Sequence, residues 1–386
     1  VLFTPPGPAL AAPFDGAVTP TVQDTGASLA PLAARGLDPD FRNPYSHSID
    51  LAVEQELPGH FGLSVGYVGN RGMRLPRFID TNVEPATTTK TYDIVDKTGN
   101  TLSTVTVPWY TSRVTYNTAS LLTGFSDLNT WYHSMVATLK KPMGYGVQLL
   151  LNYTWAKTMD MGQVGGVSGT FNGTDVPIDP NNYKAEYSRS DLDMRNRFSG
   201  IFVWSPTVKT GSSMLNYAAN GWSLSGSYTA QTGFPITPTM TNSPSSALSG
   251  SGVSGNGGIT GASVSWFNSP TSVRAPQLSR NFFPGPGLRN LDARVSRDFA
   301  INERMKMQFY VEAFNLANHA NILSVNTKYS TYYPVPTAPA TNVCSEHTNG
   351  CIAPYTGVSD FLGTTTSTSG VLFGARQAQF VAKFIF

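Results

Sequence analysis

The amino-acid sequence predicts an all-β fold, an antiparallel transmembrane β-barrel with short turns at one end and long surface loops at the other. Three observations predict this class. Apolar residues recur with a period of two in nine segments of about ten residues. The connections between these segments alternate between short and long. Charged residues make up only 13% of the chain, about half the share of a typical soluble domain.

The composition disfavours several other classes. The 27 prolines and 36 glycines among 386 residues disfavour long helices. With 40% hydrophobic residues and a net charge of +2, the chain has enough apolar surface to fold and lacks the high net charge of disordered proteins. It also lacks the basic footprint of a nucleic-acid-binding protein, so we expect no nucleic-acid partner. No run approaches the 18 or so apolar residues of a membrane-spanning helix. The chain starts at Val1 in a Pro/Ala-rich stretch with no leader, so we expect that processing or truncation removed what came before.

In chain order the alternating segments are 46–57, 61–70, 131–141, 145–157, 194–205, 220–233, 287–299, 303–316 and 376–386. A membrane band about 25 Å tall, crossed at about 3.3 Å per residue by tilted strands, needs about ten residues, which is the length of these segments. The apolar face of each strand would meet lipid, and the polar face would line the lumen. Because lipid offers the backbone no hydrogen bonds, such a sheet has to close.

Alternation is clearest in four of these segments: 145–157, 220–233, 303–316 and 376–386. The residues of their apolar faces are Val147, Leu149, Leu151, Tyr153 and Trp155; Trp222, Leu224, Tyr228 and Ala230; Met305, Met307, Phe309, Val311 and Ala313; and Ala378, Phe380, Ala382, Phe384 and Phe386. Two other segments carry discords. Arg297 shares a face with apolar residues, at a level from which it can snorkel to the interface. Ser199 and Gly200 leave the orientation of the fifth segment open.

The connections follow a strict pattern. Tight turns are expected at 58–60, 142–144 and 300–302, and a link of moderate length at 206–219. The long connections, rich in Ser, Thr, Asn, Gly and Pro, are 71–129, 158–193, 234–286 and 318–374. A compact soluble domain seldom carries structureless loops beyond roughly 15 residues, whereas outer-membrane barrels combine short periplasmic turns with long extracellular loops. We therefore divide the chain into a Pro/Ala-rich loop or linker, 1–45, and a barrel with surface loops, 46–386.

Aromatic residues lie at both ends of the apolar faces. At the level of the long loops these are Trp131, Tyr153 and Trp155, and at the level of the short turns they are Trp204, Trp222, Phe384 and Phe386. Rings at both ends of an apolar band are the girdle expected of a membrane barrel.

The polar faces of 287–299 and 303–316 form a charged wall that faces the lumen. Its members are Asp292, Arg294, Asp298, Arg304, Lys306 and Glu312. If Phe299 pairs with Glu303, Asp298 lies opposite Arg304, and opposite charges directly across a strand pair contribute roughly 0.2–1 kcal/mol. The wall either fixes the strand register or lines a substrate path or a plug contact, and we favour the first interpretation.

Two features of the long loops could carry chemistry. Cys344 and Cys351 are expected to form a disulfide in an oxidising compartment. A metal site that used His347 between them would lack a fourth ligand. The acidic loop 158–193 offers possible calcium ligands, although such residues are also ordinary turn formers, which is the interpretation we favour; they are Asp160, Asn172, Asp175 and Asp179.

The sequence gives little support for catalysis. Asp191, Asp193, Arg195 and Arg197 more simply form ion pairs at the rim than a site. There is no nucleophile elbow, P-loop or zinc-ligand helix. We therefore expect no enzyme and no catalytic, cofactor or metal residues.

Several runs, in their order and spacing, resemble Oar-like TonB-dependent transporters. They include Arg304-Met-Lys-Met-Gln-Phe-Tyr-Val-Glu-Ala-Phe-Asn-Leu-Ala-Asn-His319 and the terminal Arg376-Gln-Ala-Gln-Phe-Val-Ala-Lys-Phe-Ile-Phe386. Further similarity lies at 43–49, 66–72, 132–141, 151–157, 190–198 and 288–299, so that the resemblance covers roughly residues 40–386.

The resemblance implies a plugged barrel of about 22 strands in the outer membrane of a Gram-negative bacterium, which takes up scarce nutrients with energy passed through TonB. Because no plug and no TonB-interacting segment is recognisable, and nine strands is an odd number, we expect the C-terminal barrel portion of a longer receptor. The expected partners are the outer-membrane bilayer, a peptide or glycan ligand, and TonB with a plug domain if an upstream part exists.

Two alternatives remain open. One is a surface adhesin or structural outer-membrane protein that transports nothing. The other is a secreted soluble β-sandwich that binds glycans, in which Phe380, Phe384 and Phe386 would pack inside rather than face outward.

Overall fold

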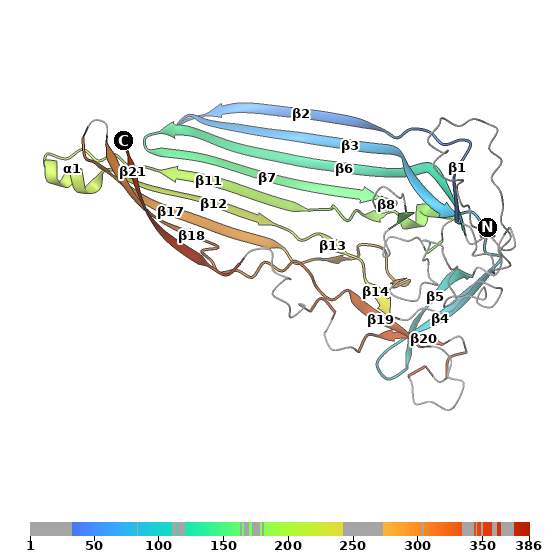
Figure 1. Ribbon diagram of the computed structural model, residues 1–386. Helices are drawn as coiled ribbons and strands as arrows, with labels where there is room; N and C mark the ends of the chain where they lie inside the picture. The colour runs from blue at the N-terminus through green and yellow to red at the C-terminus, as the bar shows by residue number, and fades with distance from the viewer. Residues whose placement is uncertain are drawn as a thin grey trace, which may run out of the picture.

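The computed structural model describes residues 33–82, 84–109, 114, 120–162, 164–165, 170–171, 178–179, 181–241, 273–302, 305–333, 343–344, 346–348, 350–356, 361–363 and 374–386. Its main element is an 11-stranded sheet (Figure 1). The main path of this sheet runs in the order β2 (Tyr45–Leu57), β3 (Phe61–Asp80), β6 (Ser120–Gly144), β7 (Val147–Asp160), β11 (Asn196–Trp204), β12 (Trp222–Gln231), β17 (Leu288–Ala300), β18 (Lys306–Phe314) and β21 (Gln377–Ile385). All pairings along this path are antiparallel.

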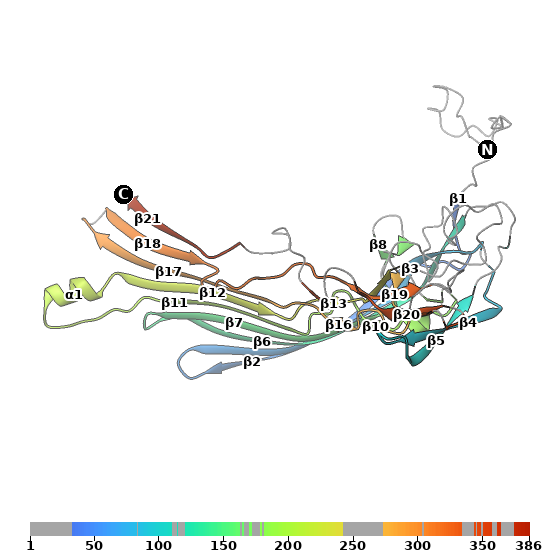
Figure 2. The same cartoon turned by 90° about the horizontal axis from the view of Figure 1, so that it is seen from below.

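The predicted all-β antiparallel class is confirmed, because each of the nine expected segments forms one strand of this path. Two further strands join the sheet at its side. β1 (Ala33–Leu37) pairs parallel with β6, and β10 (Ser188–Arg189) pairs antiparallel with β7. The expected linker 1–45 therefore contains a strand, while residues 1–32 lie outside the described residues. Figure 2 shows that the sheet is curved, with β2 and β21 as its two edges.

The strand register divides the sheet into an apolar and a polar face, because directly opposed residues of antiparallel strands point to the same side. One apolar row across neighbouring strands is Val147, Trp204, Leu224, Val295, Val311 and Phe380. One polar row on the other face is Glu54, Ser64, Thr138, Asn152, Ser199, Thr229 and Asn290. The register also settles the fifth strand, whose Phe198, Phe202 and Trp204 lie on the apolar face.

The apolar face is exposed and carries no packed core. Val53 is 73% exposed, Phe380 81% and Phe384 51%. Among the described residues, the clusters of buried hydrophobic side chains gather at the long-loop end, and none includes Leu149, Phe309 or Phe384. A soluble sandwich would have buried Phe380, Phe384 and Phe386, so this arrangement contradicts that alternative. A sheet with its apolar side chains pointing outward needs lipid as its solvent.

Two of the expected turns differ from the structure. The turn at 58–60 is confirmed, with Leu57 paired to Phe61. The turn expected at 142–144 instead lies at Tyr145 and Gly146, both with positive φ (53° and 75°), because the ladder is irregular between Lys141 and Gly144. The turn expected at 300–302 is longer, since Ala300 pairs with Lys306, and residues 303 and 304 lie outside the described part of the chain. The link 206–219 contains a short helix, α1 (Ser213–Ala219).

The long connections were expected to be surface loops, and parts of them form regular structure. They contribute a six-stranded sheet in the order β15 (Val273–Arg274), β14 (Thr239–Thr241), β19 (Lys328–Tyr333), β20 (Cys351–Pro354), β4 (Thr88–Val95) and β5 (Thr101–Trp109). Small additions are the strand pairs β13 (Pro235–Ile236) with β16 (Phe283–Pro284) and β8 (Val164–Gly165) with β9 (Thr170–Phe171), and the 3-10 helix η2 (Tyr183–Glu186). Local alternation does not reveal how this sheet is assembled, because its strands come from three different connections and four of them have six residues or fewer.

We call the six-stranded sheet, together with residues 178–193 and 273–284, the cap. In Figure 1 its strands lie at the end of the barrel wall away from α1 and the C-terminus. No helix among the described residues is long and apolar enough to cross a bilayer.

Candidate ligand-binding site

The cap is held together by a hydrophobic core to which every long connection contributes. Tyr92 and Val107 come from the first, Met240 from the third and Ile352 from the fourth, and all four are fully buried. Ile178 of the second connection packs against them. Burying each large side chain stabilises the fold by roughly 1.5–3 kcal/mol. The described parts of the four connections therefore form one folded unit.

The ring of Tyr92 is at the centre of this core. It meets the ring of Tyr332 edge to face, with centroids 5.7 Å apart. Burial raises the pKa of Tyr92 far above its usual value of 10.0, and the neighbouring Tyr332 adds to the effect. Tyr92 therefore stays neutral at every physiological pH.

Buried ion pairs join the second and third connections to each other and to the wall. The guanidinium of Arg274 binds both carboxylate oxygens of Glu186, one of them at 2.9 Å, and Glu186 also accepts the backbone N–H of Ile178 at 2.9 Å. Arg280, fully buried, donates to Asp160 at the end of β7. Removing one partner of a buried pair is strongly destabilising, by about 3–5 kcal/mol, because it leaves an uncompensated charge.

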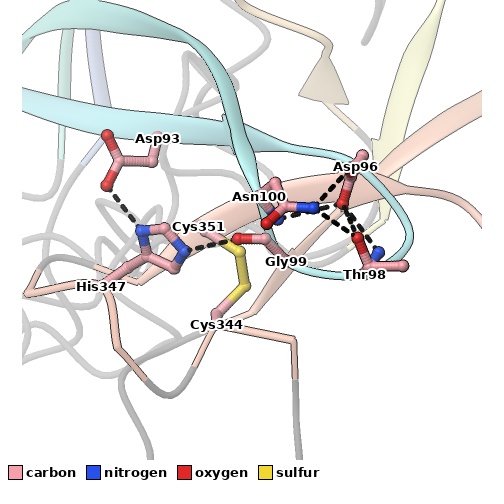
Figure 3. Close-up of a disulfide and its surroundings, with 8 residues drawn as sticks. All are labelled: Asp93, Asp96, Thr98, Gly99, Asn100, Cys344, His347 and Cys351. Carbon is pink, nitrogen blue, oxygen red and sulfur yellow. Dashed lines mark hydrogen bonds and ion pairs between the residues drawn. A yellow bond between two sulfur atoms is a disulfide. The ribbon is translucent and has the colours of Figure 1, made fainter.

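A small disulfide-closed loop ties the fourth connection to the first (Figure 3). Cys344 and Cys351 are joined in a disulfide, and both are buried beside Val95. His347, between them, places Nδ1 2.7 Å from an Asp93 carboxylate oxygen and Nε2 3.3 Å from the Gly99 carbonyl oxygen. Both partners are acceptors, so both bonds form together only when the imidazole carries a proton on each nitrogen.

The tight turn that follows β4 is organised by one carboxylate (Figure 3). Asp96 accepts hydrogen bonds from the Thr98 hydroxyl at 2.7 Å, the Asn100 side-chain amide at 3.1 Å and the backbone N–H groups of Thr98 and Asn100. These bonds, the Thr98 hydroxyl first, hold the pKa of Asp96 well below its usual 3.8.

A polar pocket of about 280 Å³ lies in the cap. It lies beside the Arg274–Glu186 pair, and Ser188, Gln277 and Ser279 add hydroxyl and amide groups to its lining. The Gln277 Oε1 and Arg274 Nε atoms are buried with no hydrogen-bond partner among the described residues. Because buried polar groups are normally paired, these two atoms point to a polar ligand or water. The pocket therefore suits sugar hydroxyls or peptide amides.

An aromatic cluster is centred on Phe283 of the cap. Phe283 lies 5.6 Å from Tyr329 and 4.7 Å from Phe361, measured between ring centroids. Its neighbour Phe282 is half exposed and is held by a hydrogen bond from Arg189 to its carbonyl oxygen. Exposed rings offer flat apolar faces for stacking.

The predicted polar wall lies on the polar face, with a register that differs from the expected one. Phe299 pairs with Met307, not Glu303, because the turn between β17 and β18 is longer than expected. Consequently Arg294 opposes and binds Glu312, which also accepts a bond from Gln379, and Asp298 binds Lys306 at 3.3 Å. Asp292 accepts the backbone N–H of Asn315 at 2.9 Å. Arg304 lies outside the described residues.

The predicted girdle residues lie on the apolar face at the expected two ends. Trp155, Trp204 and Trp222 are exposed there, as are Phe384 and Phe386, which are the last aromatic residues of the chain. Tyr153 donates to the Asn196 side chain at 2.7 Å. Trp131 differs from the other girdle residues. Its ring packs against the ring of Tyr187 and against a buried cluster formed by Leu128, Met161 and Tyr183.

The acidic residues of 158–193 are engaged with protein partners. Asp160 binds Arg280, and Asp179 accepts the backbone N–H of Asn181 at 2.8 Å, an ordinary turn contact. Asn172 and Asp175 lie outside the described residues. Within the part of the chain that the structure describes, no group of three acidic, Cys or His residues is placed to hold a metal ion.

Three of the four predicted rim residues, Asp191, Asp193 and Arg195, form ion pairs. Arg195 binds Asp193 at 2.9 Å, and Asp193 also accepts the backbone N–H of Thr158. Asp191 accepts hydrogen bonds from Arg280 and Asn281. The roles of Glu186, Arg274 and Arg280 were missed from the sequence, because the partners are 88 and 120 residues apart and no local pattern marks them.

The sequence matches the model of a known family, whereas its similarity to solved structures is distant. No curated protein matches the sequence. The outer membrane transporter YddB from Escherichia coli is similar in structure with a TM-score of 0.39 and 10% sequence identity, over 74% of this chain and 30% of that chain, so the chain spans less than a third of its length. The sequence model of the outer membrane beta barrel domain matches residues 3–379. The apolar face therefore contacts lipid in the outer membrane of a Gram-negative bacterium, and the chain belongs to the outer membrane beta barrel domain family.

Proposed function

We propose that the chain forms the barrel part of a TonB-dependent receptor, which binds a ligand at the cell surface and takes it up without chemical change. The single observation that carries the proposal is the cap. Its core joins residues of every long loop, among them Tyr92, Met240 and Ile352. Long loops on a rigid scaffold are where binding residues concentrate, and a preformed cap lowers the ordering cost of binding.

The two edges of the sheet support a larger barrel. β2 and β21 lie at opposite ends of the strand order, and each would leave backbone groups unpaired in lipid. We infer that further strands complete the cylinder, to about 22 in the transporters that the sequence resembles. A plug domain and TonB are the partners that uptake through such a barrel requires.

The ligand class that fits the cap is a glycan or a peptide. The pocket beside Glu186 and Arg274 offers charged, amide and hydroxyl groups, and the rings near Phe282 offer a stacking surface. No step of this proposal needs a catalytic group. The proposal involves only binding of the ligand and its passage through the barrel.

Uptake by cells tests the proposal. The full receptor is expressed in a Gram-negative host, and fluorescent oligosaccharides and peptides are supplied with and without a functional TonB. We expect accumulation that requires TonB and that falls in Gln277→Ala, which removes one polar group from the pocket. Lys97→Ala, an exposed change in the turn after β4, is the matched control.

Two outcomes would contradict the proposal. Surface binding without TonB-dependent accumulation would favour the adhesin, which uses the same cap and moves nothing. Equal accumulation in wild-type cells and in cells without the receptor would contradict ligand binding by the receptor as well as uptake.

A further inference from the structure

The apolar face of the wall carries charges of one sign only. Between Tyr45 and Gly72, and from Thr130 onward, the register places every Asp and Glu of the nine described wall strands on the polar face, namely Asp50, Glu54, Glu56, Asp160, Asp292, Asp298 and Glu312. The basic residues on the apolar face are Arg71, Lys141, Lys157, Arg289 and Arg297. Three lie toward the cap and two, Lys141 and Arg297, toward the turns. This asymmetry suits a surface that meets lipid phosphates.

Arg297 has the most unusual surroundings of these residues. Its guanidinium lies 4.9 Å from the ring centroid of Trp222, 4.6 Å from that of Phe299 and 5.8 Å from that of Tyr217. One of its nitrogens donates to the Tyr217 carbonyl oxygen of α1 at 3.0 Å. The snorkelling expected from the sequence is thus directed at α1.

The charge of Arg297 is not neutralised within the described protein. No acidic residue pairs with it there, and its Nε atom is buried without a hydrogen-bond partner. A guanidinium has five N–H donors, and a buried donor such as this Nε–H is costly to leave without an acceptor. Cation–π contacts offset part of this cost, but only an anion supplies both charge and acceptors.

Arg297 lines one of two adjoining apolar grooves. The larger, about 550 Å³, is lined by Arg297, Val295, Phe309, Val311 and Phe380. The smaller, about 370 Å³, shares Trp222 and Val295 with it and continues to Trp204 and Leu224. The larger volume falls in the range of ordinary ligand pockets, about 300–1,000 Å³. A cation in the wall of one groove, with a second groove adjoining, suits a two-chain lipid.

We propose that this surface binds one anionic phospholipid of the periplasmic leaflet, with its phosphate on Arg297 and its acyl chains in the two grooves. The leaflet follows from the position of Arg297 near α1, at the short-turn end that faces the periplasm. The occupant has to come from the bilayer, because this face meets lipid. Arg binds phosphate with paired hydrogen bonds, which a zwitterionic headgroup with its own cation satisfies less well.

Native mass spectrometry of the purified full chain tests the proposal. The protein is released from detergent after titration with phosphatidylglycerol or with phosphatidylcholine. We expect one phosphatidylglycerol to be retained and the apparent affinity to fall roughly fivefold or more in Arg297→Gln, as the loss of a charged hydrogen bond predicts. Lys141→Gln is the matched control. Lys141 is the other basic residue of the apolar face at this end, and its ammonium group already donates to the Gly144 carbonyl oxygen at 3.1 Å.

A second variant tests the grooves separately from the charge. Val311→Trp fills the larger groove and keeps Arg297, so it should also lower retention. Unboiled mobility on SDS gels shows whether each variant is folded. If Arg297→Gln does not fold, Val311→Trp decides, since undiminished retention there overturns the proposal. Equal retention of the two lipids, or equal losses in Arg297→Gln and Lys141→Gln, also overturns it.

Discussion

A single charge placed on either face of β3 tests whether the apolar face meets lipid. Val65 lies between Val53 and Ala137 on the apolar face, whereas its neighbour Ser64 lies between Glu54 and Thr138 on the polar face. Val65 is four residues above the turn at Phe61. At about 3.3 Å per residue and a tilt of around 40° this is roughly 10 Å, near the middle of a band about 25 Å tall.

Val65→Arg is therefore expected to cost about 2–4 kcal/mol, as an arginine on the lipid face at the bilayer midplane does. This lowers the folding equilibrium constant roughly 30- to 1,000-fold, at about 1.4 kcal/mol per factor of ten. Urea unfolding in lipid vesicles, followed by tryptophan fluorescence, measures it. The matched variant Ser64→Arg keeps the same charge and depth.

Ser64→Arg should change stability by less than about 1 kcal/mol, because the new charge faces the lumen beside Glu54. The reasoning fails if the two variants lose equal stability, or if Ser64→Arg is the costlier. Where Val65→Arg does not fold at all, Val65→Asn supplies a smaller polar change at the same position.

Three further predictions concern the cap. Glu186→Gln leaves the buried Arg274 without its ion-pair partner and should destabilise the cap by about 3–5 kcal/mol. Replacing both residues with Leu and Met should restore most of this lost stability. Hydrogen exchange of residues 178–193 measures both changes, and a loss below about 1 kcal/mol in Glu186→Gln would contradict the role of the pair. Replacing Cys344 and Cys351 with serine should cost the cap about 2 kcal/mol through loop entropy, seen as faster exchange near these residues and unchanged exchange in the wall. The turn at Asp96 should keep its full stability above pH 3.8 and lose it as the pH falls through the lowered pKa, because the ionised form is the hydrogen-bonded one; pepsin cleavage in acid should show this step, and an identical profile in Asp96→Ala would refute it.

The wall could be predicted from the sequence because its signal is local. Apolar and polar residues alternate along each strand, as Phe380, Ala382 and Phe384 show on one face. Because one face meets lipid along the whole strand, the alternation continues over its length. Register was harder, since it depends on turn geometry. Two pairings differ from those expected from the positions of the turns. One follows the irregularity between Lys141 and Gly144, and the other follows the longer turn after Ala300.

The cap could not be predicted because its contacts are not local. His347 meets Asp93 across 254 residues, and Arg280 meets Asp160 across 120. Within each loop the same residues look like ordinary Ser, Thr and Asn-rich connections. Only the ion pairing of the rim and the disulfide were expected, the disulfide because an oxidising compartment favours it.

The wall and the cap use apolar side chains in opposite ways, and the contacts between them bear on how the cap works. In the wall the large side chains point out to lipid, and in the cap they point inward to a core shared by all four loops. The two parts are joined through buried groups, since Asp160 ends β7 and binds Arg280 of the cap. Below the cap, Arg77 of β3 binds Asp127 and lies 3.8 Å from the ring centroid of Tyr183 in η2. A lid that swung open would have to expose these charges to water or lipid without their partners, at a cost of several kcal/mol. These buried contacts therefore fix the cap to the wall, and opening the cap as a whole would break them.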